Sequence, residues 1–107
     1  MTGAPLDAAD YARFATLADV LIAGGHGLPS AGAAPGFEDS VHRVLVARPD
    51  LSTAVAAVIA EPGAPDELLG ELDPARFEAF AYAVAAAYLM TPTVRRLLGY
   101  PGNAPRP

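Results

Sequence analysis

Apolar positions recur along the chain at intervals of three and four residues, which is the period of one face of an α-helix. In the first such segment they are Tyr11, Phe14, Leu17, Ala18, Leu21 and Ile22. Asp7 precedes this segment as a predicted N-cap, and Asp10 stands three residues later, close to a capping-box arrangement. We expect Gly24 and Gly25 to end the helix, and a loop rich in glycine, alanine and proline to follow as far as Gly36.

Two shorter helices are predicted in the middle of the chain. The first spans about 37–48 and ends before a proline, because the residue before proline is driven out of the α region. The second spans about 51–60, and Asp50 is its predicted N-cap. A turn at 61–65 then leads into a short acidic segment, 66–72.

The clearest helix start in the sequence is Asp73-Pro74, an N-cap residue followed by proline at the first helical position. It predicts a helix over 75–90, the longest and most apolar of the chain. One stripe of this helix consists of Phe77, Phe80, Ala81, Val84, Ala87 and Tyr88. Alanines line much of the rest, and a helix that is apolar nearly all round is typical of a bundle centre or an interface, buried on all sides.

Thr91-Pro92 repeats the pattern of cap and proline, and predicts a short last helix that Gly99 closes at its C′ position. No alternating apolar pattern of period two, typical of a strand, occurs anywhere. We therefore predict an all-α fold, a compact bundle of about five helices with a Gly/Pro-rich loop after the first helix. The 107 residues form a single helical domain, whose segment 99–107 is an extended, proline-rich C-terminal tail.

Composition excludes several classes of function. Seven arginines against twelve acidic residues give a net charge of −5, so a nucleic-acid partner is not expected. The absence of lysine and cysteine excludes Schiff-base chemistry, disulfides, thiolate catalysis and thiolate metal sites. The hydrophobic fraction of 52% and the mean hydropathy of +0.28 have two readings: a genome-wide codon bias, or apolar surface that a partner covers.

No membrane partner is expected. The most apolar stretch, Ala79 to Met90, is shorter than the roughly 20 residues of a transmembrane helix. No arginine precedes Arg13, so a cationic secretory start and a twin-arginine motif are both missing from the sequence as written. We expect the cytoplasm as the location, and the periplasm only if a partner carries an export signal.

Few residues are suited to catalysis. His26 lies in a glycine-rich loop and His42 near the edge of an apolar helix face, too far apart in sequence for a tight metal-binding motif. We read the first as an exposed loop residue and the second as a boundary residue. No nucleotide-binding glycine motif occurs, so we expect no catalytic, metal or cofactor site in this chain.

The C-terminal segment 98–107 combines one aromatic residue, one cation and several prolines that restrict its backbone. Such a segment loses little entropy when it docks on another surface. Two interpretations remain open: Tyr100 anchors the tail on a partner, or it folds back onto its own bundle. The pair Arg95-Arg96 likewise either complements the helix dipole or pairs with a partner's carboxylate.

Three sets of residues resemble the gluconate 2-dehydrogenase subunit 3 family. They are Leu17-Ala18-Asp19-Val20-Leu21-Ile22, Leu28-Pro29-Ser30-Ala31, and the ending Tyr88…Val94-Arg95-Arg96…Gly99-Tyr100-Pro101-Gly102…Pro105. The resemblance spans most of the chain, and its Gly-Tyr-Pro-Gly ending is the most specific part. It departs from the family pattern at Ala23 and Asn103, and in lacking the twin-arginine leader of many members. Members of this family are small non-catalytic subunits of large FAD-containing oxidoreductases of the glucose–methanol–choline type.

The resemblance thus implies an accessory subunit that stabilises a larger flavoprotein, with FAD in the partner and no cofactor in this chain. The alternative is a self-associating helical module, with the Ala-rich helix as the seam of a homo-oligomer and a small apolar ligand between protomers. The residues expected to contact a partner are Tyr88, Arg95, Tyr100, Pro101, Gly102, Asn103, Pro105 and Arg106.

Overall fold

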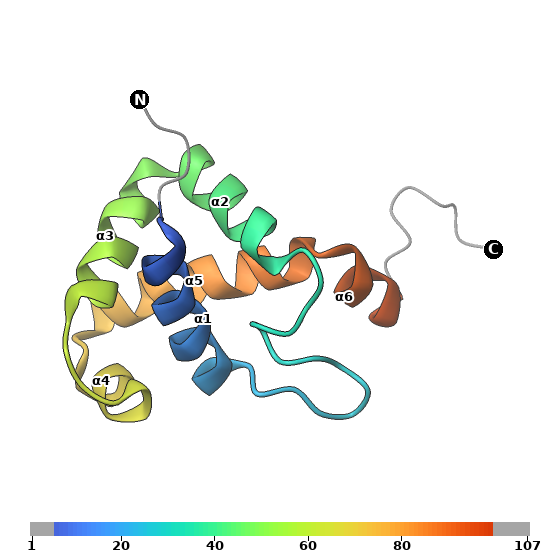
Figure 1. Ribbon diagram of the computed structural model, residues 1–107, viewed down its shortest axis with the longest axis horizontal. Helices are drawn as coiled ribbons and strands as arrows, with labels where there is room; N and C mark the ends of the chain where they lie inside the picture. Colours follow the sequence, from blue (N-terminus) through green and yellow to red (C-terminus); the bar gives the residue numbers. More distant parts are fainter. Residues whose placement is uncertain (1–5, 100–107) are drawn as a thin grey trace.

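The computed structural model describes residues 6–99, and this part of the chain folds into helices joined by turns and one long loop (Figure 1). In chain order they are α1 (Ala8–Leu21), α2 (Phe37–Ala47), α3 (Pro49–Ala60), α4 (Pro65–Glu71), α5 (Pro74–Met90) and α6 (Pro92–Leu97). No strand forms among the described residues, where a single bridge joins Gly25 and Leu28. The all-α prediction is confirmed.

The sequence predicted about five helices, and the sixth is α4, which occupies the short acidic segment. Pro65 takes its first position, and Asp66 and Glu67 lie in its first turn, where the positive end of the helix dipole favours carboxylates. Leu68 and Leu69 are buried, so packing against α1 stabilises this short helix. In the sequence, the adjacent leucines at 68 and 69 were the pattern that could have predicted this helix.

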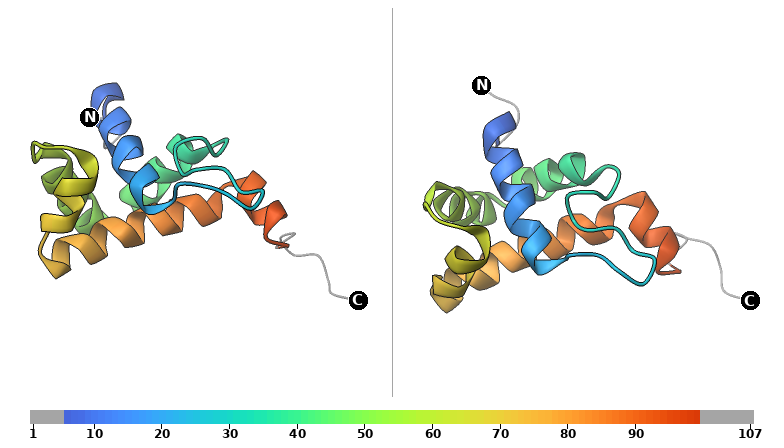
Figure 2. Two further views of the ribbon diagram at one scale, coloured as in Figure 1. Left: turned by 90° about the horizontal axis from the view of Figure 1, so that it is seen from below. Right: turned by 60° about the horizontal axis from the view of Figure 1, so that its bottom comes forward.

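The longest helix, α5, lies at the centre of the helix contacts in the described part of the chain. It packs along α2 and α3, and also contacts α1 and α6. Figure 2 shows α1, α2 and α3 on one side of α5 (orange), while the opposite side of α5 bears no other helix of the described part. The core between these helices contains Phe14, Phe37 and Phe80, and the rings of Phe14 and Phe80 lie 5.1 Å apart, centroid to centroid.

One-sided packing corrects the reading of α5 as a bundle centre, because one face of this helix is exposed in the described part. The reading of α5 as an interface stays a prediction. The stripe that packs inward is largely the predicted one, from Phe80 to Tyr88, but Phe77 at its start is 36% exposed. The opposite face holds Glu78, Tyr82, Ala85 and Leu89, which follow helical spacing and are all exposed. The described helices therefore do not enclose α5, the longest of them.

Two of the four predicted N-caps bond as expected. Asp7 accepts a hydrogen bond from the Asp10 backbone N–H at 2.8 Å, and Asp73 accepts one from the Arg76 N–H at 3.4 Å. Thr91 occupies the N-cap position of α6, but its hydroxyl donates backwards to the Tyr88 carbonyl at 2.8 Å and does not cap.

The prediction that Asp50 is the N-cap of the third helix was wrong. Helix α3 begins two residues earlier than predicted, with Pro49 at its first position and Arg48 at the N-cap position. Asp50 instead accepts two hydrogen bonds from the Arg48 guanidinium, at 2.8 and 3.0 Å, and this interaction lowers the pKa of the Asp50 carboxyl. Proline at the first helical position set this start, because its fixed φ suits the helix and its missing N–H costs nothing there.

The loop between α1 and α2 is fastened to the bundle at several points. Helix α1 ends at Leu21, before the predicted glycines, and the Ile22 carbonyl accepts a hydrogen bond from the Ala31 N–H at 3.0 Å. The Asp19 carboxylate accepts one from the Gly32 N–H at 2.7 Å. Ala31 and Ala34 are buried, so this loop contributes small side chains to the core.

Candidate partner-binding surface

Half of the large apolar side chains exposed in the described part lie around the junction of α5 and α6. Of the eight large apolar residues exposed in the described part, five lie on α5 and α6, a sixth directly follows α6, and two lie elsewhere. The six are Phe77, Tyr82, Leu89, Met90, Leu97 and Leu98. The last four fall within ten residues, 89–98, and we call them the α5–α6 corner. Large exposed apolar groups are normal singly, whereas a concentration of them is typical of an interaction surface.

The local sequence sets the geometry of this corner. Met90 ends α5, Thr91 bends the chain, and Pro92 starts α6 in a new direction (Figure 1). Thr91 and Val94 are fully buried and hold α6 against the end of α5. The corner's own apolar side chains face outward, with Leu89 and Leu97 each about half exposed.

The two arginines of α6 stand beside these apolar residues. Arg95 and Arg96 lie in its last turn, and both are exposed. Within residues 6–99 neither forms a hydrogen bond or an ion pair, whereas Arg13, Arg43, Arg48 and Arg76 each bond to a carboxylate or a backbone carbonyl. The helix dipole favours both arginines where they stand, and their guanidinium groups are free to bind a carboxylate.

Tyr88 does not fit the predicted role of a partner contact. Its side chain is 6% exposed, and its hydroxyl donates a hydrogen bond to the Pro29 carbonyl at 2.6 Å. Burial also raises the pKa of the Tyr88 phenol. Tyr88 therefore fastens the long loop to α5 from inside the fold, and a direct contact of its side chain with a partner would require the loop to open.

The remaining partner-contact residues of the sequence analysis lie outside the described residues. They are Tyr100, Pro101, Gly102, Asn103, Pro105 and Arg106. They directly follow Leu98 and Gly99, so the described chain leads into them from the α5–α6 corner. Of the two expected contacts that lie within residues 6–99, Arg95 is exposed and Tyr88 is buried.

Sequence reasoning missed Leu89, Met90, Leu97 and Leu98 as surface residues. The apolar character of α5, which contains Leu89 and Met90, was read as a sign of burial, which holds only if enough neighbouring helices exist. The sequence analysis made no prediction of exposure for Leu97 and Leu98. The signal that was available is the helical spacing of Glu78 with Tyr82, Ala85 and Leu89, since a charged residue marks the exposed face of a helix.

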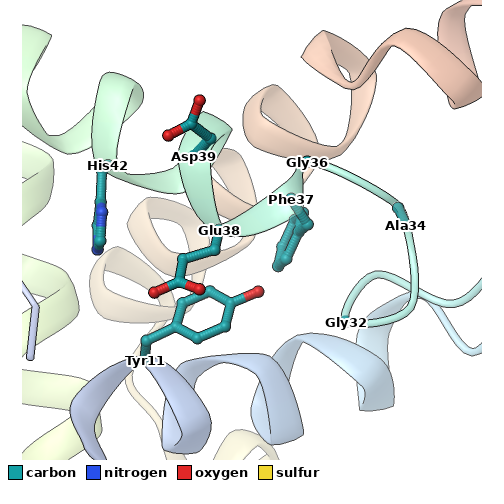
Figure 3. A pocket seen from close by; sticks show the side chains of 8 residues that line it. All are labelled: Tyr11, Gly32, Ala34, Gly36, Phe37, Glu38, Asp39 and His42. Carbon is teal, nitrogen blue, oxygen red and sulfur yellow. The ribbon is translucent and has the colours of Figure 1, made fainter. Parts of the chain in front are cut away.

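A second feature is an open pocket of about 560 Å³ between the end of the long loop, α1 and α2 (Figure 3). Tyr11, Glu38, Asp39 and His42 supply its polar groups. Burial and the nearby carboxylates of Glu38 and Asp19 raise the pKa of the Tyr11 phenol. His42 is a boundary residue, as predicted, and its Nε2 atom is buried without a hydrogen-bond partner in the structure.

This pocket contains no pairing of a nucleophile with a base. Two carboxylates, one phenol and one imidazole make it suitable for a cationic group, but nothing in the geometry assigns one. Within residues 6–99 no group of three or more histidine, cysteine or acidic side chains is placed to hold a metal ion. His26 is exposed at the tip of the turn that Gly25 and Leu28 close.

Among the described residues no helix is long and apolar enough to span a bilayer. Searches of protein-family models, of curated proteins and of solved structures each found no match to this chain. The resemblance to the gluconate 2-dehydrogenase subunit 3 family accordingly stays a prediction.

Proposed function

We propose that this chain is a non-catalytic small subunit that assembles with a larger FAD-dependent oxidoreductase of the glucose–methanol–choline type. The flavin and the catalytic residues belong to the partner, and this chain stabilises it. The observation that carries the proposal is the α5–α6 corner, where four apolar side chains between 38% and 52% exposed stand on a small acidic protein. A partner that covers such side chains removes apolar surface from water, which stabilises the complex by roughly 25 cal/mol per Å² of apolar area buried.

Among the described residues, the sets that carry the family resemblance are linked through the long loop. Asp19 of the first set bonds to the loop just after the second set, at the Gly32 N–H. Tyr88 of the third set bonds to Pro29 of the second. The three sets are distant in sequence and meet in space, which supports a common structural role: they hold the loop against α1 and α5.

The test is affinity purification of the tagged full chain from its native cells. The proposal predicts a larger chain in near-equal molar amount, with FAD bound to it and the dinucleotide-binding fingerprint in its sequence. The full chain purified alone is expected to carry no flavin. Stoichiometric flavin in the isolated chain would overturn the proposal, and so would a native preparation that contains only this chain.

Deletion of 100–107 tests the part of the surface that lies beyond the described residues. If Tyr100 anchors the tail on the partner, the truncated chain should bind it more weakly by about 2–4 kcal/mol, the cost of losing an aromatic hot spot. Its helical content should stay unchanged in circular dichroism. If Tyr100 instead packs on its own bundle, the deletion lowers the thermal midpoint and leaves the affinity unchanged.

The second candidate function is a self-associating module, which the outer face of α5 favours. Ala85 is exposed at its centre between Tyr82 and Leu89, and a small residue lets two helices approach closely. Sedimentation equilibrium of the full chain alone separates the two functions. A stable dimer or tetramer supports self-association, and a monomer supports the accessory subunit.

A further inference from the structure

Acidic and basic residues are distributed unevenly along the sequence. Residues 1–78 contain all twelve acidic residues and four arginines, whereas residues 79–107 contain three arginines and no acidic residue. The division falls within α5, between Glu78 and the α5–α6 corner. A chain with a net charge of −5 therefore has a locally cationic segment, and five of the eight large apolar side chains exposed in residues 6–99 lie in that segment.

We propose that the partner covers the α5–α6 corner with an apolar surface that is bordered by carboxylates, and that these carboxylates pair with Arg95 and Arg96. This inference rests on the proposed function and adds the chemistry of the partner's docking site. Both arginines are exposed beside the four apolar side chains, and neither has a partner in the described part of the chain. An arginine guanidinium binds a carboxylate through two parallel hydrogen bonds, which fixes orientation as well as contact.

Charge complementarity also distinguishes this partner from a second copy of the chain. A two-fold contact centred on the corner would place Arg95 and Arg96 of one protomer against the same residues of the other. Residues 79–99 contain no acidic side chain, so the corner's own segment supplies no carboxylate to offset this repulsion. Like charges brought together in this way disfavour a wrong partner, while opposite charges steer the correct one.

The predicted effect of the two arginines is on association rate and on its dependence on salt. Charges at the border of an interface attract the partner from a distance, and salt screens this attraction. The apolar side chains of the corner contribute mainly to the lifetime of the complex, because most affinity differences between related complexes lie in the dissociation rate.

The experiment measures binding of the full chain to the purified flavoprotein subunit at low and at high salt. The variants are Arg95→Glu/Arg96→Glu and the milder Arg95→Gln/Arg96→Gln. The matched controls are Arg43→Glu and Arg43→Gln, because Arg43 is an exposed helix arginine far along the chain from the corner, paired only at 4.0 Å with Asp39. Circular dichroism of each variant verifies that its helices are intact.

We expect the association rate constant of the double glutamate variant to be lower by a factor of roughly ten or more at low salt. Most of this difference in rate should disappear at high salt. The glutamine variant should show the same trend, smaller in size, and the Arg43 variants should associate like the unmodified chain. Unchanged association of both double variants would overturn the inference and leave the proposed function standing. Failure of the unmodified chain to bind the flavoprotein would overturn both.

Two further outcomes would assign the corner to a different partner. Binding of the isolated chain to vesicles of anionic phospholipid, lost in the double glutamine variant, would assign it to a lipid surface. A homodimer of the isolated chain whose stability changes in the double variants would assign the corner to a second copy of the chain. Either result would overturn the inference, which expects the isolated chain to bind neither.

Discussion

Asp7 and Asp50 are both aspartates near the start of a helix, but only Asp7 caps its helix. The difference follows from the residue that precedes each of them. Asp7 follows Leu6, stays outside α1, and caps it with a 2.8 Å hydrogen bond. Asp50 follows Pro49, and the proline begins α3 itself, which places Asp50 inside the first turn. The sequence Arg48-Pro49-Asp50 therefore contained two competing start signals, and local patterning could not rank them.

Substitution of these two aspartates tests this difference. Asp7→Ala should lower the free energy of unfolding by about 0.5–2 kcal/mol, because the Asp10 N–H loses its acceptor. Asp50→Ala serves as the control and should leave the urea midpoint nearly unchanged, since it removes only an exposed ion pair with Arg48. Equal losses in the two variants would contradict the assignment of the α3 start.

Tyr88 shows a limit of residue-level prediction. Its place in the apolar stripe of α5 was foreseen, but its bond to the Pro29 carbonyl joins residues 59 positions apart. No local pattern reveals such a contact, because it depends on how the loop returns across the bundle.

Tyr88→Phe tests the importance of this bond. The variant keeps the ring in the core and removes the hydroxyl from the Pro29 carbonyl, so unfolding free energy should fall by about 0.5–1.5 kcal/mol. Tyr11→Phe is the matched control, because the Tyr11 hydroxyl has no hydrogen-bond partner within residues 6–99. A Tyr88→Phe variant as stable as the Tyr11→Phe variant would show that the loop is held by other contacts.

Among the elements, the helices followed from the sequence far better than the loop. Period and proline placement located five helices to within a few residues, since each signal is local. The loop of residues 22–36 has no periodic pattern, and its predicted part, 24–36, is poor in large side chains that could form a core of their own. Its order comes instead from distant partners, including Asp19 on α1 and Tyr88 on α5.

Gly24 is the point of the loop where side-chain size matters most. Its φ is +91°, and a Cβ added there would lie 2.8 Å from the Ser30 backbone nitrogen. Gly24→Ala should therefore destabilise the protein by more than about 1 kcal/mol, through strain and displacement of the loop.

Gly70 in α4 provides the opposite case, because a Cβ there meets nothing within 4 Å and its backbone is helical. Gly70→Ala should stabilise the protein by about 0.4–1 kcal/mol. Urea unfolding of both variants gives the comparison. A neutral Gly24→Ala variant would contradict the close packing of the loop described above.

At the scale of the molecule, the sequence predicted an apolar central helix but not which of its faces remains open. That face depends on the number and placement of the other helices, and here α1, α2 and α3 all pack on one side of α5 (Figure 2). In the described part, most of the large apolar side chains that are exposed lie on α5 and α6 or directly after them. Arg95 was expected at a partner contact from sequence, and the structure places it beside this surface.

The most direct test of the central claim, that this chain is a non-catalytic subunit of a flavoprotein, is sedimentation velocity of the two purified chains, alone and mixed. Boundaries are followed by protein absorbance and by flavin absorbance. The account predicts that this chain alone sediments without flavin, and that on mixing the flavin boundary shifts to a heavier species containing both chains. A flavin boundary that this chain leaves unchanged would contradict the account.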